Sequence, residues 1–184
     1  MHNGPNYEVY EANPSFADGR ASRNLPPGTV ARGQLRDDDH FYTGKVNGAY
    51  AATFPFAISG TDMARGQDRF TIYCTPCHGQ VGDGKGMVVQ RGLRQAATYH
   101  QDRLRTIEVG YLFDVITNGF GAMQGYADQI PPRDRWLIAA YVRALQLSQN
   151  AKVDDVPAAD RRTLDAAVET RAAAGVEPAK KAEH

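Results

Sequence analysis

The clearest helical repeat of apolar residues in this chain follows Pro131-Pro132. Prolines favour the first turn of a helix, and Asp134 suits the positive end of the helix dipole. The pattern therefore predicts a helix from Arg133 to about Ser148 with a broad apolar face for core packing. That face carries Trp136, Leu137, Ala140, Tyr141, Ala144, Leu145 and Leu147.

A second helix is predicted from residue 61, where Thr61 or Asp62 can cap its first turn. It runs through Gly66 and Phe70 to Tyr73. Gly66 and Phe70 are four residues apart and share one helical face, so the glycine leaves a notch beside an aromatic ring. Such a face favours close crossing by another helix.

A third helix is predicted from Thr106 to Asn118, with Gly119 as its stop signal. The glycine-rich stretches 79–92 and 118–126 are predicted to be loops. The inward face of this helix is expected to carry Ile107, Leu112, Val115 and Ile116.

The regular pattern stops outside these helices. Residues 1–60 combine turn-forming pairs with many aromatic side chains, and residues 150–184 are rich in alanine and charge, with a helix predicted from Asp160 to Ala174. Aromatic anchors on an irregular segment are typical of interfaces, which favours an extended arm laid over partner subunits; packing on the chain's own helices is the alternative. We therefore predict an all-α chain with an arm (1–60), a helical domain (61–149) and a helical extension (150–184).

Charge and hydropathy exclude some partners. The 184 residues include 21 basic and 21 acidic side chains, balanced along the chain, which argues against nucleic acid as a partner. No run of about 20 apolar residues could span a bilayer. The N-terminus lacks the basic and apolar regions of a signal peptide.

The sequence Cys74-Thr75-Pro76-Cys77-His78 is a C-x-x-C-H signature of c-type haem attachment. On one helical turn, two thiols three residues apart can each form a thioether bond to one vinyl group of the same porphyrin. The following His78 then lies under the ring, where its imidazole can ligate the iron. These are the only two cysteines in the chain.

The alternatives for this motif fit less well. A disulfide would leave His78 unexplained, and a thioredoxin-like redox pair needs a preceding strand where the pattern predicts helix. A zinc site needs four ligands, and no second Cys or His pair has suitable spacing. Haem c is therefore the preferred cofactor. Because bacterial haem c is attached outside the cytoplasm, we expect that a leader has been removed.

A haem iron bound by His78 needs a sixth ligand or an open site. The favoured ligand is Met123, which lies between two helices among glycines, so that the chain can return over the distal face. A thioether ligand favours ferrous iron and raises the potential, as suits an electron carrier. His100 and Met87 remain alternatives, and the other candidates considered are Met63 and His40.

The two haem propionates need cationic or hydrogen-bonding partners. Arg91, flanked by the loop glycines, is the first choice. Other groups within reach of the porphyrin are Arg94, Arg103, Arg105, Tyr99 and the Trp136 N–H.

Residues 61–149 resemble a class I cytochrome c, on the haem motif, the helix with Gly66 and Phe70, the methionine loop and the last helix. Residues 27–33, 41–48, 82–92, 114–123, 129–136 and 144–149 resemble, more specifically, the monohaem cytochrome c subunit of bacterial alternative complex III, a quinol:cytochrome c (or oxidase) oxidoreductase. The resemblance covers most of residues 1–150. One departure is that Gln124 follows the distal methionine, where cytochromes c commonly have proline.

This resemblance implies an electron-carrying subunit without substrate chemistry of its own. It implies thioether bonds at Cys74 and Cys77, a proximal ligand at His78 and a distal ligand at Met123. Its implied partners are multihaem cytochrome and iron–sulfur subunits, with a terminal oxidase or soluble cytochrome c as acceptor. Its implied location is the periplasmic face of the inner membrane, with a lipid anchor upstream of Met1.

Other function classes remain open on the sequence. A free periplasmic cytochrome would need only a small docking patch around the haem edge. A haem enzyme or gas sensor would keep the sixth site open or displaceable, and a disulfide-bearing scaffold would carry no haem.

Overall fold

The computed structural model describes residues 4–158, 160, 161 and 163. It divides into two compact units, with the boundary between Asp37 and Asp38. The helix predicted for residues 160–174 lies almost wholly outside the described residues. No helix in the described part of the chain is long and apolar enough to cross a bilayer.

The first unit, described over residues 4–37, is built of turns. Ala12 and Arg20 pair in an isolated antiparallel bridge. Inside the loop that this bridge closes lies Phe16, and the guanidinium of Arg23 stands 4.1 Å from the centre of its ring. Tyr10 is fully exposed, so this unit presents apolar surface that its own residues do not cover.

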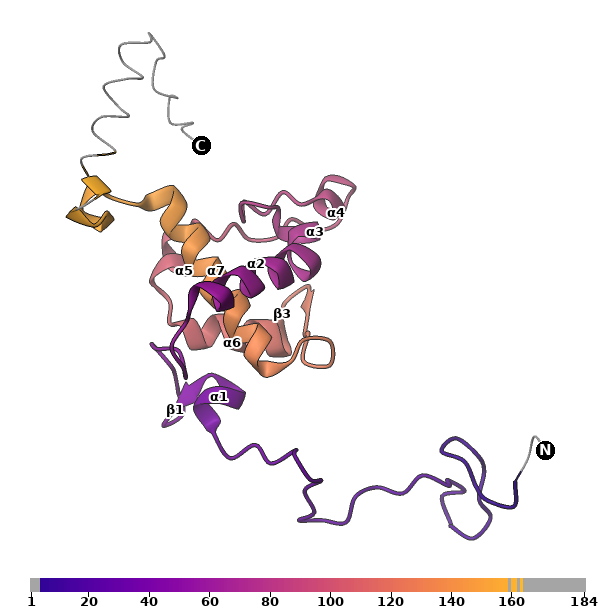
Figure 1. Ribbon diagram of the computed structural model, residues 1–184. Helices are drawn as coiled ribbons and strands as arrows, with labels where there is room; N and C mark the ends of the chain where they lie inside the picture. The colour runs from indigo at the N-terminus through magenta and orange to yellow at the C-terminus, as the bar shows by residue number, and fades with distance from the viewer. Residues whose placement is uncertain (1–3, 159, 162, 164–184) are drawn as a thin grey trace. The chain divides into compact units, whose positions relative to one another are not determined.

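The second unit is mainly helical, which confirms the predicted all-α class (Figure 1). Two antiparallel pairs, β1 with β2 and β3 with β4, are only two residues long per strand. In chain order the elements are α1 (Asp39–Thr43), β1 (Lys45–Val46), β2 (Ala49–Tyr50), α2 (Gly60–Tyr73), α3 (Thr75–His78), α4 (Met87–Gln90), α5 (Asp102–Thr106), α6 (Val109–Asn118), β3 (Gly119–Phe120), β4 (Met123–Gln124), α7 (Pro132–Asn150) and the 3-10 turn η1 (Val153–Asp155).

The core is organised by the crossing of α2 over α7, as Gly66 predicted. A Cβ atom at Gly66 would clash with the carbonyl oxygen of Leu137, so only glycine allows this approach. One turn further along α2, the ring of Phe70 lies 5.2 Å from that of Tyr141. The middle of α7 is buried on all sides. Its buried residues include Ile138, Ala139 and Val142, which were not part of the predicted apolar face.

Residues 38–60 pack against the helices, which differs from the predicted division after residue 60. Phe41, Phe54 and Phe56 surround Trp136 and Phe113 in one apolar cluster. The indole N–H of Trp136 donates to the carbonyl of Phe41 at 2.9 Å. For residues 38–60 of the predicted arm, the structure therefore shows the alternative of packing on its own domain.

Three local features differ from the sequence pattern. Ser59, not Thr61 or Asp62, is the N-cap of α2, and Asp62 completes a capping box with it. Helix α6 begins at Val109, because residues 102–106 form the separate short helix α5. The predicted methionine loop contains the hairpin of β3 and β4.

Candidate haem-binding site

The attachment motif lies where α2 ends and α3 begins. The N–H of Cys74 still donates to the carbonyl of Phe70 in α2, at 2.9 Å, while its own carbonyl accepts from His78 at 2.8 Å. Cys74 therefore closes one helix and opens the next, with Pro76 in the first turn of α3. Both thiols and the imidazole are thus fixed within one short helical segment.

The two thiols are free, and no disulfide joins them. Cys74 is buried, with 8% of its surface exposed, and Cys77 is partly buried. Burial, and secondly the nearby Cys77 side chain, raise the pKa of Cys74 to about 12. A reactive redox cysteine needs a lowered pKa, so this environment disfavours the redox-pair alternative.

The imidazole of His78 is oriented by a backbone carbonyl. Its Nδ1 lies 3.3 Å from the carbonyl oxygen of Ala97. Burial lowers the pKa of His78, and the contact with Ala97 opposes that shift only in part. A neutral ring that donates from Nδ1 keeps its lone pair on Nε2, the atom that can bind iron.

Two tyrosines lie near the thiols. The ring of Tyr99 stacks on that of His78, with centroids 4.6 Å apart. Burial, and then the proximity of Cys74 and Cys77, raise the pKa of Tyr99 well above its usual value and also raise that of Tyr126. An aromatic ring therefore packs on the imidazole of the motif, and a second one lies near its thiols, which fits a porphyrin site.

Met123 lies half-buried on β4, opposite Phe120 in the hairpin. The N–H of Tyr126 donates to the carbonyl of Ile116 at 2.9 Å, which ties the segment after the hairpin to α6. Tyr126 follows Met123 by three residues and is the same tyrosine that lies near both thiols. The chain thus returns toward the motif just after Met123, which remains the predicted sixth ligand.

The other candidate ligands occupy different surroundings. His100 directs Nε2 to the carbonyl of Val81 at 2.7 Å. His40 lies edge-on to the ring of Trp136, with centroids 5.7 Å apart. Met87 is 56% exposed on α4, and Met63 lies in the first turns of α2.

The predicted propionate partners are only partly available. Arg91 is exposed at the C-terminal end of α4 and remains the predicted partner. Arg94 and Arg103 are also exposed, whereas Arg105 pairs with Asp102 at 3.1 Å. The Trp136 N–H does not fit this role, because it is buried and donates to Phe41.

Sequence reasoning missed the residues behind His78. Nothing in the sequence marks Ala97 as the carbonyl that the imidazole meets, because any residue offers that group. Gln146, which donates to the carbonyl of Tyr99, could have been noticed in the sequence. It is a polar residue on the apolar helix α7, three residues after Arg143. A buried polar side chain on such a face must be hydrogen-bonded.

Two free thiols and an imidazole on one turn, with tyrosines beside them, fit a covalently bound porphyrin. Together with the helical architecture, this donor set defines a class I c-type cytochrome domain that carries haem c and its iron. Residues 61–142 match the family model described as cytochrome c oxidase, cbb3-type, subunit III.

The solved and curated proteins add little to this assignment. A chain of a reducing HAO-like protein complex from Kuenenia stuttgartiensis is 16% identical, with 58% of this chain covered and a TM-score of 0.43. The match spans about half of that chain (54%), and a similarity this weak supports no functional conclusion. No curated protein matches the chain.

Proposed function

We propose that this chain is the monohaem electron-transfer subunit of a membrane quinol-oxidising complex of the alternative complex III type. Quinol oxidation takes place on other subunits. The chain accepts single electrons from multihaem cytochrome and iron–sulfur subunits, and passes them to a terminal oxidase or a soluble cytochrome c. Its location is the periplasmic face of a bacterial inner membrane.

The haem site supports electron transfer over catalysis. Haem c, when bound, supplies a one-electron couple at its iron. His78 and Met123 would both ligate the iron and leave no ligand position for a substrate. The thioether bonds to Cys74 and Cys77 would keep the cofactor in place through repeated cycles. The ring of Tyr99, stacked on that of His78, would hold the imidazole in place beneath the cofactor.

The N-terminal unit supports the proposal that the chain belongs to a complex. Val9 is 65% exposed and Tyr10 is fully exposed, beside a loop stabilised by the bridge between Ala12 and Arg20. A free carrier needs only a weak patch at its haem edge. A separate unit with exposed aromatic anchors is more typical of a permanent subunit contact.

Affinity purification from the native membrane tests this proposal. We expect the tagged chain to be recovered after detergent extraction with multihaem and iron–sulfur subunits, and its haem to be reduced by quinol in that preparation. The double change Val9→Ser with Tyr10→Ser should lower recovery of the partners at least several-fold and leave the haem spectrum unchanged. The matched control is Val46→Ser, at an exposed valine of the second unit.

Release of the chain from the membrane fraction without partner subunits, and with a normal haem spectrum, would show a free carrier. Rapid carbon monoxide binding to the reduced protein would show an open sixth site and favour an enzyme or sensor. Either result contradicts the proposal.

A further inference from the structure

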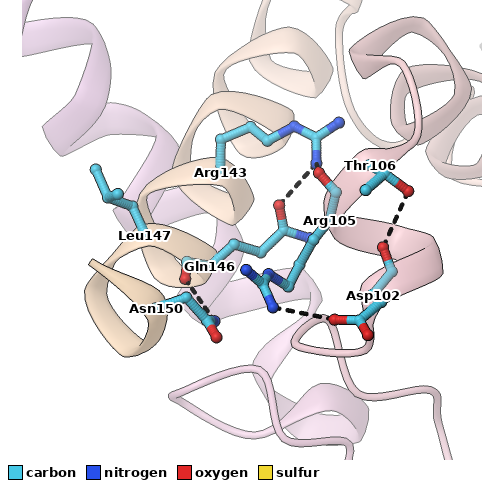
Figure 2. Close-up of a pocket in the computed structure, with 7 residues that line it drawn as sticks. All are labelled: Asp102, Arg105, Thr106, Arg143, Gln146, Leu147 and Asn150. Atoms are coloured by element: carbon cyan, nitrogen blue, oxygen red, sulfur yellow. Dashed lines mark hydrogen bonds and ion pairs between the residues drawn. The ribbon is translucent and has the colours of Figure 1, made fainter. Parts of the chain in front are cut away.

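One buried amide on α7 holds the segment that contacts His78. Gln146 is only 5% exposed. Its Nε2 donates to the carbonyl of Tyr99 at 2.8 Å and to that of Leu104 at 3.0 Å. Its Oε1 accepts from Arg143 at 2.7 Å, one helical turn away (Figure 2). Both polar atoms of the side chain are therefore engaged.

Arg143 fixes which way this amide points. A guanidinium can only donate, so the oxygen of Gln146 must face it and the nitrogen must face the carbonyls. Arg143 is itself held, because it also donates to the carbonyls of Leu104 and Arg105, at 3.0 and 3.1 Å, and to that of Ile107. The pair thus ties α7 to the segment around α5.

Tyr99 carries this restraint to the imidazole. Its N–H donates to the carbonyl of Gly82 at 2.9 Å, so the backbone is held on both sides of the residue. Its ring stacks on His78 with an interplanar angle of 17°. Ala97, two residues earlier, provides the carbonyl that faces Nδ1 of His78. One short segment therefore presents both a ring face and an acceptor to the same imidazole.

We propose that Gln146 is a positioning residue for the haem iron, acting through Tyr99 and Ala97 on His78. A hydrogen bond from the second ring nitrogen raises the basicity of a metal-binding imidazole. A more basic ligand stabilises ferric iron and lowers the reduction potential, so loosening this contact raises the potential. The inference rests on the haem site alone and does not depend on membership of a respiratory complex.

Redox titration of the purified holoprotein tests the inference. Gln146→Leu removes both donations, and Gln146→Glu keeps the volume and the contact with Arg143 while losing the donor. Both variants should raise the midpoint potential, seen as a several-fold higher ratio of ferrous to ferric haem at a fixed applied potential. The spread of the paramagnetically shifted haem methyl resonances, which reports the orientation of the imidazole plane, should change with them. The control is Gln67→Leu, at an exposed position of α2.

An unchanged potential and unchanged methyl shifts in the Gln146 variants overturn the inference. An equal shift in Gln67→Leu overturns it as well. Where Gln146→Leu does not accumulate as holoprotein, Gln146→Glu decides the outcome, since it preserves packing. A negative result for the Gln146 variants would not change the recovery of partner subunits. Failure of this inference is therefore distinguishable from failure of the proposed function.

Discussion

At the scale of single residues, burial determines what the groups of the haem motif can do. The Cys74 thiol, enclosed in the core, has a pKa of about 12, so it is an apolar side chain until a thioether replaces its proton. The His78 ring is held neutral by the same burial and is oriented by the carbonyl of Ala97. The motif is therefore arranged for attachment and ligation and not for thiol chemistry.

The first prediction concerns the sixth ligand. Met123→Ala should abolish the weak long-wavelength absorption band of methionine-ligated ferric haem. It should also lower the midpoint potential by on the order of 100 mV, because a thioether ligand favours ferrous iron. An optical redox titration measures both. Met87→Ala is the control, and loss of the band in that variant alone would assign the ligand to Met87.

At the scale of elements, glycine decides how closely the two main helices can approach. Gly66 of α2 faces the backbone of Leu137 in α7, while Phe70 and Tyr141 fill the space beside it. The last turn of α2 carries Cys74 at its C-cap. Displacing this crossing therefore displaces Cys74, the first predicted thioether site.

The second prediction follows from that crossing. Gly66→Ala should lower the free energy of unfolding by roughly 1–3 kcal/mol, as overpacking does, and reduce the yield of holoprotein. Gly60→Ala is the matched control, because it lies in the same helix with open space around its Cα. Urea unfolding of both variants measures the difference. Equal stability of the two would contradict the close approach.

The third prediction concerns acid stability at the start of α2. Hydrogen bonds from Ser59, and then from Arg133, lower the pKa of Asp62 from 3.8 to about 2. A carboxylate with a lowered pKa in the folded state stabilises that state above its unfolded value and loses the effect as the pH falls. The contribution of Asp62 should therefore be complete above about pH 4 and be lost between about pH 4 and pH 2.

Unfolding curves measured across that range test the capping box. Asp62→Asn should flatten the decline of stability below about pH 4, while Asp128→Asn, at an exposed residue, should leave it unchanged. If the stability of Asp62→Asn fell with pH as steeply as that of the wild type, the Asp62 carboxylate would not be hydrogen-bonded in the folded state as described.

At the scale of the whole molecule, the residues before α2 belong to two different units. Residues 38–60 complete the helical core through Phe41, Phe54 and Phe56, whereas the first unit keeps its aromatic side chains exposed. The chain therefore combines a haem domain with its own N-terminal support and a separate unit available for protein contacts.

The fourth prediction tests that support. Trp136→Phe keeps an aromatic ring against Phe113 but removes the donor to the Phe41 carbonyl. It should lower the free energy of unfolding by about 1–2 kcal/mol, since a buried acceptor loses its partner. Hydrogen exchange should rise most in residues 38–60. An increase confined to other segments would contradict the anchoring of this stretch by Trp136.

The sequence was sufficient for features that depend on spacing. The C-x-x-C-H turn, the crossing at Gly66 and the long helix after Pro131 follow from residue order, and each lies where the pattern indicated. Contacts between distant segments could not be predicted in this way. The hydrogen bond between Trp136 and Phe41 joins residues 95 positions apart. The sequence pattern alone therefore favours a partner contact for aromatic residues that in fact pack in the core.

The residues around His78 could not be predicted from the sequence either. The carbonyl of Ala97 is a backbone group that any residue offers. The sequence shows Gln146 as a polar residue on an apolar helix, but not which carbonyl its side chain meets. Short elements such as α5 and the β3–β4 hairpin form because neighbours hold them, and their sequences alone carry too few residues for a periodic signal.

We predict that a single haem is bound covalently through Cys74 and Cys77. Intact-protein mass spectrometry under denaturing conditions, on material from a host that matures c-type cytochromes, tests it most directly. We expect the polypeptide mass to be increased by one haem, and this increment to be lost when both cysteines are replaced by alanine. A polypeptide without the added haem would contradict it.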